Sequence, residues 1–299
     1  MVFARGEANF ASHAFIPIIF STQVLAILDK TCAAIKCVNT DYEGEVRKFG
    51  DIVRARQFGD ITLNPYTPYT TVTYQTVQEL FQDLVIDQFD IWAFIVDHTD
   101  IQQSDLAVMD GYADRAAIAV RNGIDSSILT VMQAGVAAAN QIGSPAIGSV
   151  VQGTPENIYG VVTDLLTLLE QSNAFSVTNE RPFLIVPPPL KNLFVKSKYA
   201  RWTPSGDTAT TSAECMEFGE FDVEITTNLP FVQAVPGVSD GYYAVVGGLK
   251  YATSHAMQLN DIENITPFQT LVGDAMRGLV LFGTKVFHPT ALCKLIVKV

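Results

Sequence analysis

Residues 100–140 carry apolar side chains at helical spacing over an unusual length. The recurring positions are Leu106, Met109, Ala113, Ala116, Val120, Ile124, Ile128 and Val131. A helix rises by about 1.5 Å per residue, so roughly 35 helical residues span about 50 Å. Ser104 or Thr99 is the candidate N-cap, because its side-chain oxygen can accept a hydrogen bond from an unpaired backbone N–H. The pattern predicts one helix that is longer than a compact domain of this size needs.

Three glycines, Gly111, Gly123 and Gly135, fall within this predicted helix. Each weakens a helix interior by up to about 1 kcal/mol relative to alanine. We expect them to let another backbone approach closely or to let the helix bend. A long buried helix also occurs in ordinary α/β proteins, so the flanking sequence has to decide the fold.

A segment rich in Thr, Tyr and Pro separates two runs of alternating polarity, residues 52–57 and 72–78. This predicts a long β-hairpin over residues 50–78 with an irregular tip around residues 64–69. A two-stranded hairpin is marginally stable in water, so its apolar side chains need a surface. That surface is the core of the same chain in a monomer, or a neighbouring subunit in an assembly. The residues expected to contact a neighbour are Val53, Ile61, Leu63, Tyr66, Tyr69, Val72 and Tyr74.

The first 96 residues contain three further predicted elements. Residues 1–20 are expected to form an extended arm, and residues 80–96 contain two strand-like runs. Residues 21–36 form a predicted amphipathic helix whose apolar side consists of Val24, Leu25, Leu28, Cys32 and Ile35. Cys32 and Cys37 lack the pairing of a zinc site and are expected to be small core residues.

A second region follows a Gly- and Ser-containing linker at residues 143–153. Its predicted helices cover residues 154–171, 189–199 and 249–257. Its predicted strands cover residues 182–188, 220–227 and 243–246, and a flexible loop covers residues 203–213. The C-terminal tail carries strand-like runs at residues 279–282, 285–287 and 295–299.

Composition excludes several classes of protein. The 299-residue chain has a net charge of −12, and its 19 Lys and Arg residues never form a stripe, which argues against a nucleic-acid-binding protein, because neutralising phosphates requires clustered Lys and Arg. Apolar residues make up 48% and charged residues 17%, so the chain is expected to fold and to bury surface against partners. No apolar run approaches the roughly 20 residues of a membrane span. We therefore expect neither a signal peptide nor a membrane anchor.

One acidic cluster is a candidate for chemistry: Asp87, Asp90, Asp97, His98 and Asp100. An EF-hand starting at Asp97 fails, because it lacks the glycine needed at its sixth position. No phosphate-binding loop, dinucleotide fingerprint, nucleophile elbow or zinc-protease helix is present. We expect no catalytic, cofactor-binding or metal-binding residues, and hence no enzyme.

Three stretches together resemble the major capsid protein of tailed bacteriophages, which has the Hong Kong 97-like fold. The first comprises Phe15-Ile16-Pro17, Asp41-Tyr42-Glu43-Gly44, Gly50-Asp51-Ile52-Val53 and Gly59-Asp60-Ile61. The second comprises Ile86-Asp87-Gln88, Val96-Asp97, Asp100-Ile101-Gln102-Gln103 and Ile124-Asp125. The third comprises Gly273-Asp274-Ala275-Met276-Arg277-Gly278-Leu279, Phe282-Gly283-Thr284-Lys285-Val286 and His288-Pro289. Each motif is loose alone, but their order and spacing span nearly the whole chain.

The resemblance implies an α+β fold with four parts. Residues 1–45 would be the N-terminal arm, and residues 46–80 the extended hairpin loop. Residues 81–150 and 266–299 would form the peripheral domain, whose spine helix is the helix at about 100–140. Residues 151–265 would form the axial domain, which meets its neighbours at five-fold and six-fold centres.

The function implied by the resemblance is structural. Pentamers and hexamers of the chain would assemble in the host cytoplasm, with a scaffolding protein and a portal, into the icosahedral shell of a virion that encloses double-stranded DNA. The arm begins almost at Met1, which predicts a separate scaffolding protein. Residues 50–78 contain no Lys, which predicts stabilisation without the Lys–Asn isopeptide bond of some members, or by cement proteins. The alternatives are an encapsulin-like cargo compartment and a soluble metal-dependent enzyme using Asp97, His98 and Asp100.

Overall fold

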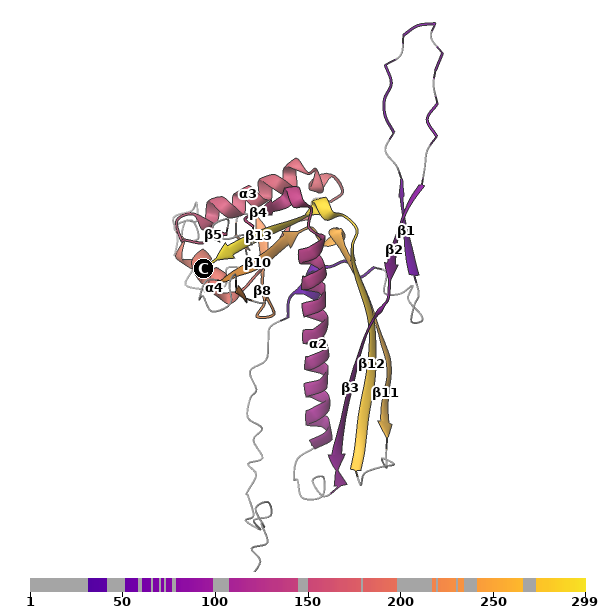
Figure 1. Cartoon of the computed structure of the whole chain (residues 1–299), viewed down its shortest axis with the longest axis vertical. Helices are drawn as coiled ribbons and strands as arrows, with labels where there is room; N and C mark the ends of the chain where they lie inside the picture. Colours follow the sequence, from indigo (N-terminus) through magenta and orange to yellow (C-terminus); the bar gives the residue numbers. More distant parts are fainter. Residues whose placement is uncertain are drawn as a thin grey trace, which may run out of the picture.

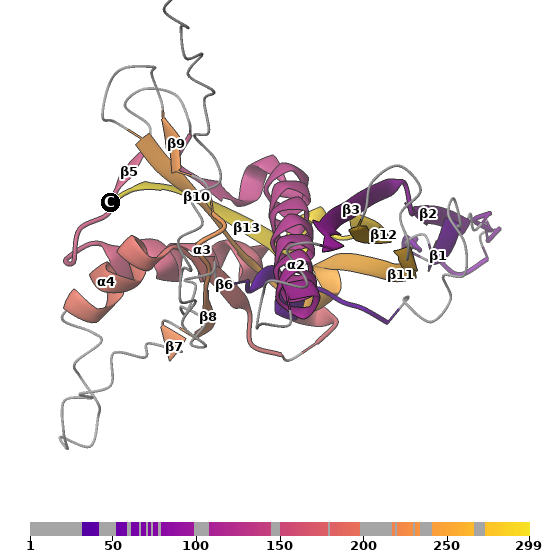
Figure 2. The same cartoon turned by 90° about the horizontal axis from the view of Figure 1, so that it is seen from below.

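A long helix lies between two β-sheets, and a narrow hairpin projects from the smaller sheet (Figures 1 and 2). The computed structural model describes residues 32–41, 52–58, 61–65, 67–69, 71–72, 74–76, 79–98, 108–144, 150–178, 180–197, 217–218, 220–229, 231–233, 241–265 and 273–299. The expected arm at residues 1–20, most of the helix at residues 21–36 and the loop at residues 203–213 lie outside this range. The mixed helix-and-sheet fold class predicted from the sequence is confirmed.

The long helix is α2, Val108–Gly135, so the prediction of one long helix is confirmed. Its candidate N-caps lie outside the described residues. The core-facing side chains concentrate in its C-terminal half, at Ile124, Ile128, Leu129 and Met132. Close approach is confirmed only at Gly135, where a Cβ atom would lie 2.5 Å from Cγ2 of Val286. Glycine is needed at this position because any larger residue would collide with the Val286 side chain.

The smaller sheet has three antiparallel strands in the order β11-β12-β3 and packs against α2. Its strands are β3 (Gln88–Asp97), β11 (Thr253–Ile265) and β12 (Gly273–Val286). The helix predicted at residues 249–257 is therefore wrong: a single turn, η6 (Lys250–Ala252), leads into β11. Thr253 pairs with Val286 across the strands, and this long-range ladder overrides the local helical spacing. The runs at residues 279–282 and 285–287 belong to one strand.

The projecting hairpin consists of β1 (Ile52–Phe58) and β2 (Glu79–Val85). The strands pair antiparallel from Ile52 opposite Val85 to Phe58 opposite Glu79. The hairpin and its first strand are confirmed, but the second strand is wrong at residues 72–78, whose described part has no regular secondary structure. The ladder begins later, at Glu79, and its register places Leu84 opposite Val53, with both side chains buried in the same small core.

The larger sheet has eight strands, with β4-β13-β10-β6-β8-β7 in order, β5 beside β13 and β9 beside β10. The strands are β4 (Gln141–Ile142), β5 (Val151–Gln152), β6 (Phe183–Val186), β7 (Glu217–Phe218), β8 (Phe221–Ile225), β9 (Phe231–Gln233), β10 (Gly241–Gly248) and β13 (Leu292–Lys298). Helices α3 (Ile158–Gln171) and α4 (Pro188–Lys196) pack beside it. These helices and the strands β6, β8, β10 and β13 confirm the predicted elements to within a few residues. The helix predicted to start at Thr154 begins instead at Ile158. Thr154 lies in the preceding turn, where its backbone carbonyl accepts the N–H of Ile158 at 3.0 Å.

Short 3-10 turns complete the fold: η1 (Ala34–Cys37), η3 (Ala138–Asn140), η4 (Ala174–Ser176) and η7 (Pro289–Ala291). The main core joins η1, α2, α3, α4 and the larger sheet. A second, smaller core lies at the base of the hairpin and consists of Val53, Leu84, Ile86, Ala256, Leu281 and Phe287. The two cores tie both sheets and the hairpin base into one molecule.

Candidate shell-forming surfaces

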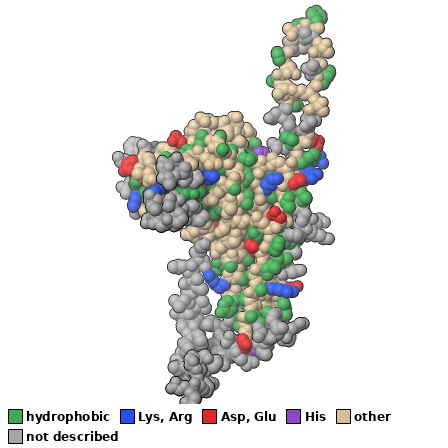
Figure 3. Space-filling model, viewed as in Figure 1, with side chains coloured by type: hydrophobic (Ala, Val, Ile, Leu, Met, Phe, Trp, Pro, Cys, Tyr) green, Lys and Arg blue, Asp and Glu red, His purple; other side chains and the backbone are tan. Residues whose placement is uncertain are grey.

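The distal part of the hairpin exposes large apolar side chains. Leu63 is 96% exposed and Tyr74 is 92% exposed, and Ile61, Tyr69 and Val72 are exposed as well. Figure 3 shows hydrophobic side chains along the hairpin, which stands clear of the rest of the protein. Five of the seven residues expected to contact a neighbour are therefore accessible to one.

The other two expected contact residues, Tyr66 and Val53, are not among the exposed ones. Tyr66 lies outside the described residues. Val53 is only 6% exposed and packs in the small core at the hairpin base. Its alternation on β1 turns it toward the strands of its own chain, so it has no side-chain surface to offer a neighbour. Val53 is therefore corrected to an intramolecular core residue.

Polar contacts fix the base of the hairpin to the smaller sheet. The Arg54 guanidinium on β1 donates two hydrogen bonds to the Asp83 carboxylate on β2, at 2.8 and 3.0 Å. This hydrogen bond holds the pKa of Asp83 below its usual value. Lys285 on β12 donates to the backbone carbonyl of Asp83 at 2.7 Å. The base of the hairpin is therefore bonded to β12 of its own chain.

A second apolar surface, which sequence reasoning missed, lies on the outer face of β3. Phe89, Ile91 and Ile95 alternate along the strand and are exposed. On the opposite face, the ring of Phe94 lies 5.8 Å from that of Tyr112 on α2. The signal was present in the sequence, because residues 89–96 are almost continuously apolar. Such a run is typical of a strand covered on both faces, and on this face Phe89, Ile91 and Ile95 keep 58%, 69% and 41% of their surface exposed.

The described members of the acidic cluster form no metal-binding group. Asp87, Asp90 and Asp97 are exposed, and the Nε2 atom of His98 lies 3.1 Å from Oδ1 of Asp274. Asp100 lies outside the described residues. Across the part of the chain that the structure describes, no three His, Cys, Asp or Glu side chains gather so as to hold a metal ion. The arrangement gives the metal-enzyme alternative no support.

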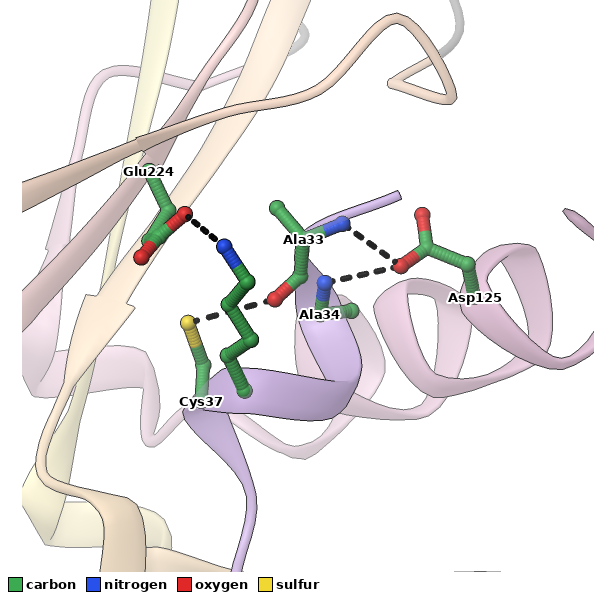
Figure 4. Close-up of polar contacts among 6 residues, drawn as sticks. Ala33, Ala34, Cys37, Asp125 and Glu224 are labelled. Carbon is green, nitrogen blue, oxygen red and sulfur yellow. Dashed lines mark hydrogen bonds and ion pairs between the residues drawn. The ribbon is translucent and has the colours of Figure 1, made fainter. Parts of the chain in front are cut away.

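The most connected polar residue is Asp125 on α2, which is 1% exposed (Figure 4). Its Oδ1 atom accepts the backbone N–H groups of Ala33 at 3.0 Å and Ala34 at 2.7 Å. Its Oδ2 atom accepts the side-chain amide of Asn228 at 2.7 Å. One carboxylate thus joins the segment before η1, the long helix and the loop after β8. Sequence reasoning missed this junction, although an acidic residue beside Ile124, in line with Ile128 and Leu129, was a signal.

Two buried thiols are structural. Cys37 and Cys293 are buried, and burial raises the pKa of each thiol to about 12. At neutral pH they are therefore protonated and inert. The prediction of a small core residue is confirmed for Cys37, whereas Cys32 is only partly buried.

A membrane-spanning role finds no support among the described helices, since none of them is both long enough and apolar enough to cross a bilayer.

The fold resembles solved phage capsids over nearly the full chain. A Mycobacterium phage Che8 structure is 20% identical, with a TM-score of 0.73, and the match covers 96% of this chain and 98% of that one. The capsid of cyanophage P-SCSP1u is 15% identical, with a TM-score of 0.68 and coverage of 95% and 93%. The capsid of Ralstonia phage GP4 is 10% identical, with a TM-score of 0.65 and coverage of 99% and 97%. No curated protein matches the chain in sequence.

Family membership rests on sequence as well as on fold. A family model described as phage capsid protein matches residues 82–295, which is well over half of the chain. The matched range contains α2, β3 and β12, together with the larger sheet up to residue 295 in β13. The chain therefore belongs to the family of phage capsid proteins.

Proposed function

We propose that this protein is the major capsid subunit of a tailed phage, many copies of which form the icosahedral shell around a double-stranded DNA genome. The observation that carries the proposal, beside family membership, is the exposed apolar surface of the hairpin. Five large side chains held in water by a narrow two-stranded element are costly in a monomer. A neighbouring subunit is the surface that would cover them.

The division into arm, loop, peripheral domain and axial domain remains part of this proposal. Two boundaries are best drawn along the sheets. Strand β11 pairs with β12, so we assign residues 253–265 to the peripheral domain beside α2. Strand β13 pairs with β10, so we assign residues 292–298 to the axial domain. The arm at residues 1–45 and the loop at residues 46–80 keep their boundaries.

The proposal also covers the assembly partners of the protein and the compartment in which it assembles. We propose pentamers and hexamers, a separate scaffolding protein and a portal, with assembly in the host cytoplasm and no catalytic role. The net charge of −12 suits a shell that does not adhere to its packaged DNA, because like charges repel. Cement proteins are an available source of further stability.

Negative-stain electron microscopy tests the proposal, with the chain expressed alone and together with its candidate scaffolding protein. Closed shells, tubes or polyheads tens of nanometres across are the expected result. A Leu63→Ser, Tyr74→Ser double variant should remain a folded small species, because both side chains are exposed in the single chain. A small monodisperse wild-type species under both conditions would overturn the proposal, and shells that co-purify with an enzyme as cargo would favour an encapsulin-like compartment instead.

A further inference from the structure

The segment of residues 33–39, which contains η1, ends against the outer edge of the smaller sheet. The backbone N–H of Asn39 donates to the carbonyl of Thr253 at 2.9 Å, and the N–H of His255 donates to the carbonyl of Asn39 at 2.9 Å. These two bonds pair Asn39 with Ser254 in parallel. Because β11 is the outer strand in the order β11-β12-β3, this segment covers the edge of β11 that faces away from β12.

The other end of the segment is tied to the long helix (Figure 4). The N–H groups of Ala33 and Ala34 donate to the buried carboxylate of Asp125. Between the two ends, Cys37 and Val38 are buried in the main core. The segment therefore joins α2 to β11, and its attachment to β11 is two backbone hydrogen bonds.

His255 lies directly beside this attachment and is completely buried. Its neighbour Ala256 packs in the small core, so strand alternation directs the imidazole to the opposite face, where its centroid lies 6.2 Å from that of the Phe282 ring. The Nδ1 atom lies 2.8 Å from the hydroxyl of Thr284. The Nε2 atom is buried and has no hydrogen-bond partner among the described residues. By the same alternation Val38 lies on the face of the imidazole.

The charged side chains of the surrounding elements are engaged elsewhere. Lys285 of β12 donates to the carbonyl of Asp83 at the hairpin base. Lys36 of η1 pairs with Glu224 of β8 at 3.4 Å. The carboxylate of Asp125 on α2 accepts the N–H groups at the start of the segment. The buried imidazole therefore has a hydroxyl beside it and no carboxylate to pair with if it becomes charged.

Proton uptake opposes this arrangement. Burial lowers the pKa of His255 from 6.5 to about 4, while the Cys37 thiol, with a pKa of about 12, stays neutral throughout. If the edge of β11 opens, water can reach the imidazole and its pKa returns toward the ordinary value. Between pH 6.5 and 4 only the open form then binds the proton, so a falling pH favours opening.

We propose that residues 33–39 form an acid-sensitive latch, in which protonation of His255 detaches Val38 and Asn39 from β11 while the rest of the protein stays folded. The attachment of Ala33 and Ala34 to Asp125 does not involve the imidazole, so the segment would stay tied to α2. The latch is a property of the single chain and does not depend on the proposed shell.

The thiol of Cys37 reports opening of the latch. A full-length chain with Cys32→Ser, Cys215→Ser and Cys293→Ala keeps this one thiol and is labelled at dilution with a dipyridyl disulfide, which reacts with thiols in acid as well as at neutral pH. The ratio of the labelling rate at pH 5 to that at pH 7 should be about twentyfold larger with His255 than with His255→Gln, because this histidine binds its proton only in the open form.

Two controls make the measurement specific. His98→Gln removes a partly exposed histidine far along the smaller sheet and should leave the acid acceleration unchanged. A second chain keeps Cys293 and carries Cys37→Ala. Because Cys293 is fully buried in β13, its labelling reports unfolding of the body and should accelerate much less than that of Cys37 between pH 7 and pH 5. Val38→Ala weakens the latch itself and should speed Cys37 labelling at both pH values.

Three results would overturn the proposal. Equal acid acceleration with His255 and His255→Gln would show that another group drives the opening. Parallel acceleration at Cys37 and Cys293 would show that the whole protein unfolds and that no separate latch exists. Unchanged Cys37 labelling between pH 7 and pH 5, after comparison with a free thiol, would show that the segment stays on β11 when acid is added.

Discussion

At the scale of single residues, hydrogen bonds to Asp125 join segments that are distant in the sequence. Its buried carboxylate accepts three donors within 3.0 Å, which are the N–H groups of Ala33 and Ala34 and the amide of Asn228, and it also accepts the hydroxyl of Thr226 at 3.4 Å. Asp125→Ala would leave all three without this acceptor, and a buried unsatisfied donor costs about 1–3 kcal/mol. We expect a loss of about 3 kcal/mol in the free energy of unfolding of the unassembled chain, measured by urea denaturation.

Two companion variants make this prediction specific. Asp125→Asn keeps an acceptor for the two N–H groups, and its own amide can donate to the buried and unpaired Oδ1 atom of Asn228, so about 1 kcal/mol should be lost. Asp114→Ala, at an exposed position of the same helix, should be nearly neutral. Equal costs for Asp125→Ala and Asp114→Ala would contradict the role given to this carboxylate.

His255 on β11 makes stability depend on pH. Its Nδ1 atom lies 2.8 Å from the hydroxyl of Thr284, and burial lowers its pKa from 6.5 to about 4. Above pH 6.5 it is neutral whether the chain is folded or unfolded. Between pH 6.5 and 4 only the unfolded chain takes up the proton, so stability falls as the pH falls.

The size of this effect is measurable by comparing urea unfolding at pH 7 and pH 5. We expect wild-type protein to lose about 2 kcal/mol more than His255→Gln over this interval. Glutamine can still meet Thr284 but cannot bind the proton. Parallel losses in the two proteins would show that the imidazole is not the group responsible.

At the scale of elements, the hairpin divides into a base that stabilises the chain and a distal part that does not. Leu84→Ala, in the small core, should cost about 2–5 kcal/mol of unfolding free energy. Leu63→Ser should change it by less than about 0.5 kcal/mol, because Leu63 is fully exposed in the single chain. Light scattering should nevertheless show slower or absent assembly for Leu63→Ser. A stable Leu63→Ser protein that assembles at the wild-type rate would remove this side chain from the interface.

Elements with a strong local period could be predicted from the sequence. Helix α2 and helix α3 repeat their apolar residues at helical spacing, and β6 is a short buried run between turn residues. The predictions fail where pairing with a strand distant in the sequence determines the secondary structure. Residues 253–257 have an ambiguous pattern and become strand because Thr253–Met257 pair with β12.

The contacts of Asp125 show that sequence patterns also fail to reveal the distant partners of a polar residue. The sequence places the acid on a helix but gives no information on its partners, which lie 91 and 103 residues away. The exposure of the distal hairpin side chains was easier to predict, because apolar residues in a Thr- and Tyr-rich segment are a local property. Only Val53, at the base, required knowledge of the packing.

At the scale of the whole molecule, two cores stabilise the chain by itself, while among the described residues large apolar side chains are exposed along the hairpin and on the outer face of β3. A shell made from such subunits would gain its stability by covering these side chains. Between residues 50 and 78 the hairpin has no Lys to form an isopeptide bond. Purified shells boiled in detergent and reductant should therefore run as a single band at the mass of one chain. A ladder of covalent multimers on the gel would contradict this prediction. Without covalent links between subunits, urea alone should dissociate the shells into single chains.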